Sequence, residues 1–269
     1  MIFVYWGEDK SGKDTLGLTF PKPLVVMEFD IGGFRRACRN LPHLPIKDWY
    51  EQGLIRVEEY VMPFQLAEEF DPIKDIVRPD KIVRGMKELF YQFAAKFIKH
   101  LKDPEIATIM VDTGTLLNEI TIGGYLQELQ EKQLPLRPDG LGRDGKTLRS
   151  QLQQQEYRER NVRMRGFAYQ AKAHGKNLVV THHASDEYGL VRDSRGQLVQ
   201  GQTGKRVLHG WAQWGDSADV VGHTYWDSKA KKPYFKVELA EVKELEEMVF
   251  EEPTYDKIAG VIKMIRGEE

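Results

Sequence analysis

The residues with the clearest chemical potential form one short run near the N-terminus. Gly7-Glu8-Asp9-Lys10-Ser11-Gly12-Lys13-Asp14-Thr15 follows the apolar segment at residues 2–6. This run matches the phosphate-binding pattern GxxxxGK[ST], except that Asp14 stands where a serine or threonine is usual. In that pattern backbone N–H groups surround phosphate oxygens and the lysine neutralises their charge. The run therefore predicts a nucleotide-binding site in which Lys13 acts on the phosphates.

The aspartate at position 14 affects the predicted binding of Mg²⁺ more than the predicted binding of the nucleotide. The usual hydroxyl ligates Mg²⁺ without adding charge, whereas a carboxylate can ligate the ion but adds negative charge near the phosphates. Lys13, the metal and the N-terminus of the following helix would have to offset that charge. We therefore expect Asp14 to be a metal ligand, while Thr15 could still contact a phosphate.

A second acidic position is expected at the end of another strand. Residues 106–111 are mostly apolar and are followed by Asp112 and Thr113. A phosphate loop needs such a carboxylate to hold Mg²⁺ through water. Asp112 is therefore predicted to be the metal-side carboxylate, with a cap of the next turn as the alternative. Thr113 occupies the place where many ATPases carry a glutamate, so the group that orients water must come from elsewhere.

Two further strand ends supply candidates for catalysis. Glu28 and Asp30 share one face of a strand because of its two-residue period, and Asp30, at the C-terminal end, is favoured to position the attacking water. The alternative is a simple loop cap. His182 and His183 end another apolar strand, and either could contact the γ-phosphate. We assign His182 to catalysis, with a structural histidine or, less favoured, a metal ligand as alternatives.

Composition limits the classes of protein that fit. With 269 residues, 41% hydrophobic and 30% charged, the chain can bury a full core in one domain or two small ones. A net charge of −2 does not indicate nucleic acid, so DNA binding would depend on local basic loops. The single cysteine, Cys38, excludes an internal disulfide and fits a reducing cytosol. No segment approaches a membrane span, so we expect a cytoplasmic protein.

The order of the expected elements predicts an α/β fold. Strands are predicted at residues 2–6, 24–29, 54–60, 106–111, 178–181, 220–225 and 234–239, and helices at 83–102, 150–173 and 255–266. A short helix should follow the phosphate loop and end before Pro21. The alternation predicts a mostly parallel sheet flanked by helices, with an antiparallel C-terminal extension. We assign residues 1–240 to this domain and 241–269 to a helical tail packed on it or following it.

Two stretches are predicted to be long loops, at residues 134–148 and 185–208. Long irregular segments are either functional or simply solvated surface. Trp211, Trp214 and Trp226 gather in the C-terminal part, where a role as interface anchors and a role in the core are equally compatible with the sequence.

Together, the phosphate loop at residues 7–15, the quick return to a strand with the acidic end at Asp30, and the strand ends at Asp112 and His182-His183 resemble phage RecA-like P-loop ATPases. This family includes the Sak-type single-strand annealing or recombination proteins. The resemblance covers the chain to about residue 239. It implies a RecA-like P-loop NTPase fold, with binding of ATP and Mg²⁺, the acidic strand end near the catalytic water and a γ-phosphate sensor at residues 181–183.

The resemblance also implies partners and a biological role. The expected partner is single-stranded DNA, contacted through residues 134–148 and 185–208, and the expected process is DNA recombination, annealing or replication. Assembly of several copies is expected, since a neighbouring subunit commonly completes such a site. The location implied is the cytoplasm, either of a phage's host or of a bacterium.

Two other functions stay open from the sequence. The loop at residues 11–15 also resembles those of some phage-type deoxynucleoside monophosphate kinases. A lid for phosphoryl transfer would then come from Arg158, Arg160, Arg163 and Arg165, which are more simply a solvated basic helix face. The early strand with its acidic end favours the ATPase. The third possibility is a nucleotide-binding structural module without turnover, which Asp14 and Thr113 motivate.

Overall fold

The computed structural model describes residues 1–40, 44–63, 81–192 and 195–268. Its strands are β1 (Ile2–Gly7), β2 (Leu24–Glu28), β3 (Ile55–Glu59), β4 (Thr108–Asp112), β5 (Asn177–Arg192), β6 (Leu198–Leu208), β7 (Val220–Asp227), β8 (Lys232–Ala240) and β9 (Val249–Glu251). Its α-helices are α1 (Lys13–Leu18), α2 (Gly33–Asn40), α3 (Ile46–Glu51), α4 (Met86–Lys102), α5 (Gly114–Gln133), α6 (Tyr157–Ala173) and α7 (Tyr255–Arg266). Short 3₁₀ turns lie at Gln154–Glu156, Gln213–Asp216 and Lys243–Leu245.

The central sheet is mostly parallel, in the order β3-β2-β4-β5-β1-β7-β8-β9. Strands β3, β2, β4, β5, β1 and β7 all pair in parallel, and β8 and β9 extend the sheet in the antiparallel sense. The register aligns Gly7 with His183, and Glu28 with Asp112. Because parallel strands end at one edge of a sheet, these residues meet at the carboxyl edge.

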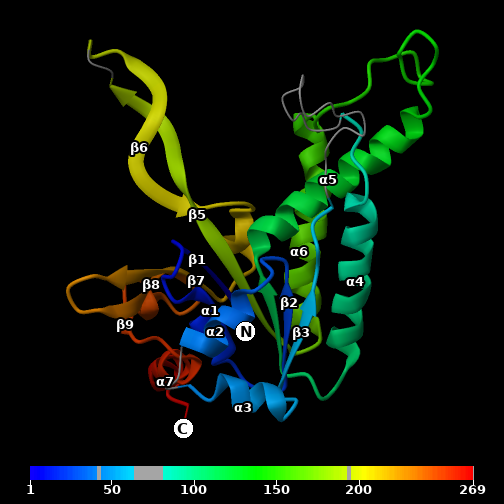
Figure 1. Ribbon diagram of the computed structural model, residues 1–269. Coiled ribbons are helices and arrows are strands. Elements are labelled where there is room, and N and C mark those ends of the chain that lie inside the picture. Colours follow the sequence, from blue (N-terminus) through cyan, green and yellow to red (C-terminus); the bar gives the residue numbers. More distant parts are fainter. Residues whose placement is uncertain (41–43, 64–80, 193–194, 269) are drawn as a thin grey trace.

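Helices cover both faces of the sheet and form two cores (Figure 1). One face packs against α4, α5 and α6 through the side chains of Phe93, Ile120 and Phe167. The other face packs against α1, α2, α3 and α7, and there Leu16 and Ile258 are fully or almost fully buried. Within the described residues, no helix is long and apolar enough to cross a membrane.

The predicted mixed α/β architecture is confirmed, with a mostly parallel sheet and an antiparallel C-terminal extension. The strands expected at residues 2–6, 24–29, 54–60, 106–111, 220–225 and 234–239 form within two residues of their predicted ends. The short helix after the phosphate loop is α1, and α4, α6 and α7 lie in the predicted helical segments. Residues 134–148 contain no helix or strand, as expected.

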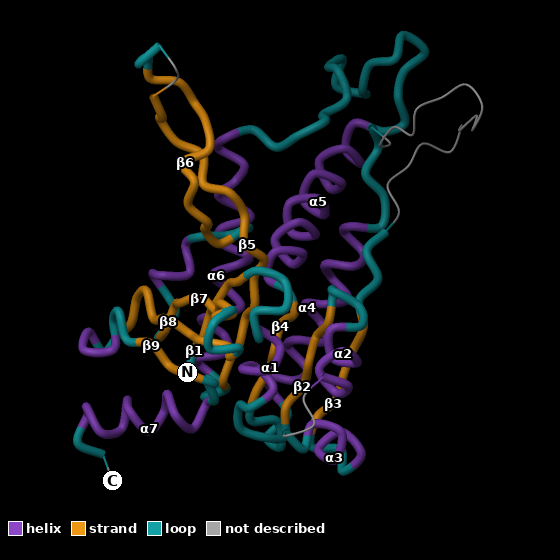
Figure 2. Tube along the Cα trace, turned by 60° about the vertical axis from the view of Figure 1, so that its left-hand side comes forward, coloured by secondary structure: helices purple, strands orange, loops and turns teal. Residues whose placement is uncertain are grey.

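The prediction of a loop at residues 185–208 was wrong. Strand β5 continues to Arg192 and pairs with β6 from Ala184↔Leu208 to Arg192↔Leu198. The two strands form a long hairpin that projects away from the sheet (Figures 1 and 2). Glycines and glutamines suggested a loop, but Tyr188, Val191 and Val199 supply the β-branched and aromatic residues that favour strands.

The sequence pattern did not indicate α5, the longest α-helix of the described structure. This helix packs against both α4 and α6, and many of its buried residues are polar. Thr121 Oγ1 donates to the Leu117 carbonyl, and the Gln130 amide donates to the carbonyls of Lys81 and Arg149. Because its buried faces carry threonine and glutamine, no single apolar stripe marks it as a helix.

The three C-terminal tryptophans have different environments. Trp211 and Trp214 are buried in the core beside α6, with ring centroids 4.6 Å apart in an edge-to-face arrangement. These two side chains are core residues rather than exposed interface anchors. Trp226, by contrast, is 52% exposed.

Candidate nucleotide site

The phosphate loop begins where β1 ends and is shaped by two glycines. A Cβ at Gly7 would lie 2.4 Å from Thr224 Oγ1 and 2.5 Å from Ser11 Oγ, so no larger residue fits there. The hydroxyls of Ser11 and Thr224 are hydrogen-bonded at 2.7 Å, which attaches the loop to β7. Gly12 has φ +93°, a conformation that other residues rarely adopt, and it starts α1. The sequence thus folds this loop tightly against the sheet edge.

Lys13 is directed back over the loop. Its Nζ donates to the carbonyl oxygens of Gly7 at 3.0 Å and Glu8 at 2.8 Å, and its side chain is buried. The Tyr5 hydroxyl donates to the Lys13 carbonyl at 2.6 Å and fixes the first turn of α1 from the core side. The ammonium group is therefore held in the concave side of the loop, where a phosphate would be bound.

A cavity of about 990 Å³ opens beside this loop. Its lining includes six residues of the predicted loop, and they are Asp9, Lys10, Gly12, Lys13, Asp14 and Thr15. Asp30 and Asp112 from the neighbouring strand ends also line it, as do Thr113 and His183. The cavity lining does not include the other predicted site residues, Gly7, Glu8, Ser11, Glu28 and His182. The structure therefore brings Lys13, Asp14, Asp30 and Asp112 to one cavity.

Three carboxylates converge on the backbone of Gly33, at the start of α2. A Cβ built there would lie 2.9 Å from Asp112 Oδ2, 3.1 Å from Glu28 Oε1 and 3.5 Å from Asp14 Oδ2. Glu28 Oε1 accepts a 2.7 Å hydrogen bond from the Phe34 N–H, which anchors α2 to this cluster. Glu28 Oε2 is buried without a hydrogen-bond partner among the described residues. Only a glycine allows the chain to pass so close to these oxygens.

Burial raises the pKa of all three carboxyl groups, most strongly that of Asp112. The charge of Asp14 raises the Asp112 pKa further, and the hydrogen bond from Thr181 only partly opposes this. Lys13 and Arg36 oppose the increase at Asp14. A positive charge placed among these oxygens would therefore be stabilised electrostatically.

The donor chemistry of Asp14 and Asp112 suits Mg²⁺, which takes one or two carboxylates together with water and phosphate oxygens. Among the described residues, no group of three or more histidine, cysteine, aspartate or glutamate side chains has the arrangement of a metal site made by protein alone.

The two histidines at the end of β5 face opposite sides of the sheet. The ring of His182 is buried among α5 and α6 residues, where Trp214 lies 5.9 Å away, and its Nδ1–H donates to the His209 carbonyl at 3.0 Å. Burial lowers the pKa of His182 to about 3, so it is a neutral core residue. The structure does not bring His182 into the cavity, because residues 178, 180 and 182 share the other face. His183 lines the cavity instead.

Thr113 caps α5. Its Oγ1 accepts a 3.3 Å hydrogen bond from the Leu116 N–H, and its side chain is buried. Neither a base nor a water-orienting carboxylate stands at this position. Among the carboxylates at the strand ends that line the cavity, Asp112 is buried, whereas the Asp30 side chain is 42% exposed.

Several cavity residues were not indicated by the sequence. They are Arg36 and Ala37 of α2, Leu44, and from the C-terminal part Trp226, Lys231, Pro233, Glu252, Pro253, Thr254 and Lys257. The C-terminal group comes from the β7–β8 hairpin and from the segment that enters α7. A Cβ at Gly12 would lie 3.1 Å from Pro233 Cβ, which shows how closely this hairpin packs on the phosphate loop. No local sequence motif marks these positions.

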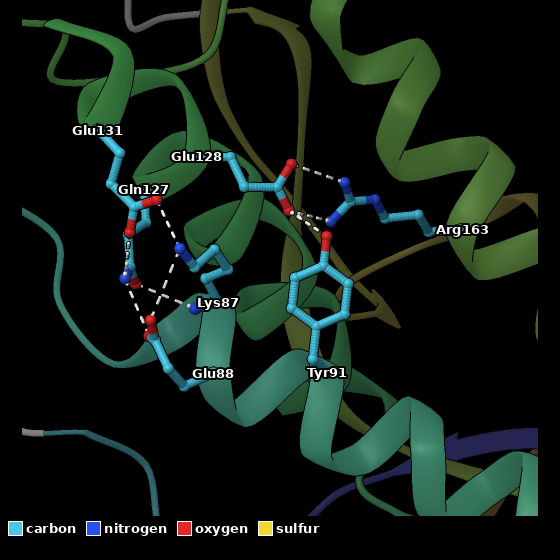
Figure 3. A network of polar contacts seen from close by, with 7 residues as sticks. All are labelled: Lys87, Glu88, Tyr91, Gln127, Glu128, Glu131 and Arg163. Atoms are coloured by element: carbon cyan, nitrogen blue, oxygen red, sulfur yellow. Dashed lines mark hydrogen bonds and ion pairs between the residues drawn. The ribbon is translucent and has the colours of Figure 1, made fainter.

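The arginines considered as a kinase lid lie on α6 and do not line the cavity. Arg163 forms a bidentate pair with Glu128 of α5, at 3.0 and 3.1 Å (Figure 3). It also binds Glu159 at 2.9 Å. Figure 3 also shows Lys87 and Tyr91 of α4 in the same network. Arg165 lies 3.8 Å from Asp216, and Arg160 donates to Asn161. The geometry gives Arg163 a structural role between helices.

No protein-family model matches this chain, and no curated protein is significantly similar to it. The function must therefore be inferred from the cavity and from the elements that form it.

Proposed function

We propose that this protein binds ATP with Mg²⁺ in the cavity at the carboxyl edge of its sheet and hydrolyses it, as a RecA-like P-loop ATPase of the phage type. The observation that carries the proposal is that Lys13, in the helix that follows β1, and Asp112, at the end of β4, line one cavity although β1 and β4 are not neighbours. A phosphate-binding lysine and a buried strand-end carboxylate are the two groups that Mg²⁺-ATP requires.

The strand order supports the same proposal. Strand β5 lies between β1, which leads into the phosphate loop, and β4, which ends in Asp112. His183, the last residue of β5 that pairs with β1, lines the cavity and would report the state of the phosphates. The crevice at the carboxyl ends of parallel strands is where ligands of open α/β sheets bind.

Different residues of the cavity would bind the phosphates, the metal ion and the attacking water. The loop amides and Lys13 would hold the β- and γ-phosphates, and Asp14 and Asp112 would hold Mg²⁺ directly or through water. Bound Mg²⁺ supplies charge neutralisation at the phosphate oxygens. Asp30 would orient the attacking water, since its side chain is accessible at the cavity. Glu28 does not line the cavity, and it accepts a hydrogen bond from the Phe34 N–H at the N-terminus of α2.

The part of the cavity lined by the β7–β8 hairpin fits a nucleoside. Trp226 is half-exposed there, and its cross-strand partner is Pro233, so a flat apolar surface borders the phosphate loop. Lys231, Glu252 and Thr254 add polar groups around it. An aromatic face with a few polar neighbours is suited to stacking a base. We therefore place the base on Trp226.

DNA is the proposed partner, through the β5–β6 hairpin and residues 134–148. The hairpin begins at Ala184, which directly follows the cavity residue His183. A movement of His183 on loss of the terminal phosphate would therefore be transmitted directly to the hairpin. Arg206 near the hairpin base binds Glu8 of the phosphate loop as well as Asp186. The hairpin carries Arg192 and Lys205 and the exposed ring of Tyr188, groups that suit backbone contact and base stacking.

The decisive experiment measures three reactions with one preparation. ATP hydrolysis is followed with and without single-stranded DNA, ADP formation is followed with a panel of deoxynucleoside monophosphates, and nucleotide binding is measured directly. DNA-stimulated phosphate release supports the proposal. ADP formation that depends on a monophosphate indicates a kinase, and binding without turnover indicates a structural module.

Lys13→Ala should abolish hydrolysis and weaken binding of both ATP and ADP. Lys22→Ala is a matched control, since Lys22 interacts with the Trp49 ring and does not line the cavity. Full activity of the Lys13 variant would overturn the site assignment.

A further inference from the structure

We propose that Arg36 is a catalytic residue of this cavity, whose guanidinium binds the terminal phosphate of the nucleoside triphosphate and stabilises its charge during transfer to water. The inference rests on the proposed function and adds a residue that no sequence motif indicates. It concerns an arginine supplied by the same chain, on helix α2.

The position of Arg36 supports a contact with the phosphates. The side chain lines the cavity together with Lys13, Asp14 and Asp112. Its Nη1 lies 3.6 Å from where a Cβ on Gly32 would stand, so the guanidinium lies over the glycine turn that enters α2. The Arg36 N–H donates to the Gly32 carbonyl at 3.0 Å, which fixes the backbone from which the side chain extends. Gly32 has φ +99°, a conformation that favours glycine, and this turn directs the chain into α2.

The present partner of Arg36 holds it only weakly. Its Nη2 lies 3.3 Å from Asp30 Oδ2, a long ion pair whose side chains are 58% and 42% exposed. Exposed pairs of this kind contribute little to stability. A phosphate offers the same guanidinium a stronger, charge-assisted contact, since planar N–H pairs match two phosphate oxygens. Exchange of Asp30 for a phosphate is therefore favourable.

The charges at this end of the cavity call for a second cation. The cavity is lined by the carboxylates of Asp14, Asp30 and Asp112. The positive charges of Lys13 and Arg36 lower the pKa of Asp14. Lys13 is bound to the carbonyls of the phosphate loop. Lys10, Lys231 and Lys257 also line the cavity, but Arg36, on α2, is the side chain whose positive charge, together with that of Lys13, acts on Asp14.

The exchange also gives Asp30 its role. When Arg36 turns to the phosphate, Asp30 is released and can accept a hydrogen bond from the attacking water. The water oxygen forms a bond to the γ-phosphorus, and the bond from that phosphorus to the bridging oxygen breaks with its electron pair moving to ADP. The proton of the water passes through Asp30 to the phosphate product. Negative charge increases on the oxygens that the guanidinium contacts.

Arg35 is a matched control from the same helix. It precedes Arg36 in the chain, but its Nη2 binds Glu59 of β3 at 2.7 Å, and it does not line the cavity. Adjacent helical residues point about 100° apart, which accounts for their different partners. Both side chains are exposed, so replacing either should leave the fold intact.

The test compares wild type, Arg36→Ala, Arg36→Lys and Arg35→Ala for the binding of ATP and ADP by calorimetry with Mg²⁺, and for the rate of hydrolysis. Arg36→Ala should bind ATP at least tenfold more weakly, bind ADP within about twofold of wild type, and lose on the order of 10² in kcat. Arg36→Lys should keep part of the affinity and little of kcat, because an ammonium lacks the fork of N–H groups. Arg35→Ala should match wild type in all three.

The outcomes separate this inference from the proposed function. If the wild-type protein binds neither nucleotide, the proposed function is wrong, and the role proposed for Arg36 is wrong as well. If wild type binds ATP, whether or not it hydrolyses it, the ratio of ATP to ADP affinity decides the role of Arg36. Equal loss of ATP and ADP affinity, or a variant indistinguishable from Arg35→Ala, would overturn the inference.

Discussion

Thr181 Oγ1 donates a 2.6 Å hydrogen bond to Asp112 Oδ1, and both side chains are buried. The bond joins Thr181 of β5 to the last residue of the neighbouring strand β4, and Asp112 lines the cavity. It fixes the orientation of the carboxylate whose other oxygen, Oδ2, approaches Glu28 and Asp14 near Gly33. The proposed metal-side ligand is thus oriented by the strand that lies between the phosphate loop and β4.

Thr181→Val should remove this bond while keeping the shape of the side chain. We expect the free energy of unfolding to fall by about 1–3 kcal/mol, because a buried carboxylate loses its donor. The Mg²⁺ concentration needed for half-maximal hydrolysis should rise, since Asp112 is no longer held in one orientation. Denaturant melts and Mg²⁺ titrations measure both effects. Thr181→Ser, which keeps the hydroxyl, is the control, and equal behaviour of the two variants would argue against a positioning role.

Asp112→Asn should stabilise the protein at neutral pH while abolishing hydrolysis. Burial and the Asp14 charge raise the pKa of Asp112 in the folded state. The folded state therefore binds this proton more tightly than the unfolded state, and stability falls as pH rises above the ordinary carboxyl pKa of about 4. An asparagine carries no charge at any of these pH values and can still accept from Thr181. The gain should be on the order of 1 kcal/mol or more at pH 7.

The measurement for Asp112→Asn is thermal unfolding between pH 5 and pH 8 without nucleotide. The advantage of the variant over wild type should grow with pH and disappear toward pH 4. Asp216→Asn is the control, because Asp216 is an exposed residue away from the cavity. A variant less stable than wild type at pH 8 would show that the Asp112 charge is already compensated in the free protein.

Trp226 should report nucleotide binding by its fluorescence. A base stacked on the exposed indole would change the emission when ATP is added, and Trp226→Phe should remove most of that change while keeping a stacking surface. Trp226→Ala should weaken binding by about tenfold or more, given roughly 1–3 kcal/mol for base–aromatic stacking. Trp49→Phe is the control, because Trp49 packs against Lys22 away from this cavity. An ATP-induced signal that survives in Trp226→Phe would place the base elsewhere.

The outer part of the β5–β6 hairpin should be needed for DNA and not for ATP. Replacing residues 188–202 by an Asn-Gly turn keeps the Glu187 to Thr203 hydrogen bond and the Arg206 contacts with Glu8 and Asp186. ATP affinity should be unchanged, and stimulation of hydrolysis by single-stranded DNA should be lost. Fluorescence anisotropy with a labelled oligonucleotide and a phosphate-release assay measure the two. Normal stimulation in the shortened protein would assign DNA contact to other residues.

Much of the site was predictable because its residues are close in sequence to recognisable strand ends. The glycines of the phosphate loop, Lys13, and the acidic residues Asp30 and Asp112 each follow an apolar run, and parallel strands end at the same edge of a sheet. The choice between His182 and His183 was not predictable in this way. It depends on which face of β5 packs against α1 and which packs against α5 and α6. The alternation of side chains shows that the two histidines point to opposite faces, but it does not show which face is which.

Short-range patterns of apolar residues and glycine were enough to predict the loop at residues 7–15, the strands around it and their acidic ends. The folded arrangement was needed to see that β5 and β6 form a hairpin, that polar α5 packs against α4 and α6, and that Arg36, Trp226 and Lys257 border one cavity. These features arise from contacts between segments far apart in the chain. They are fixed by strand order and packing, which leave no mark on any single stretch of sequence.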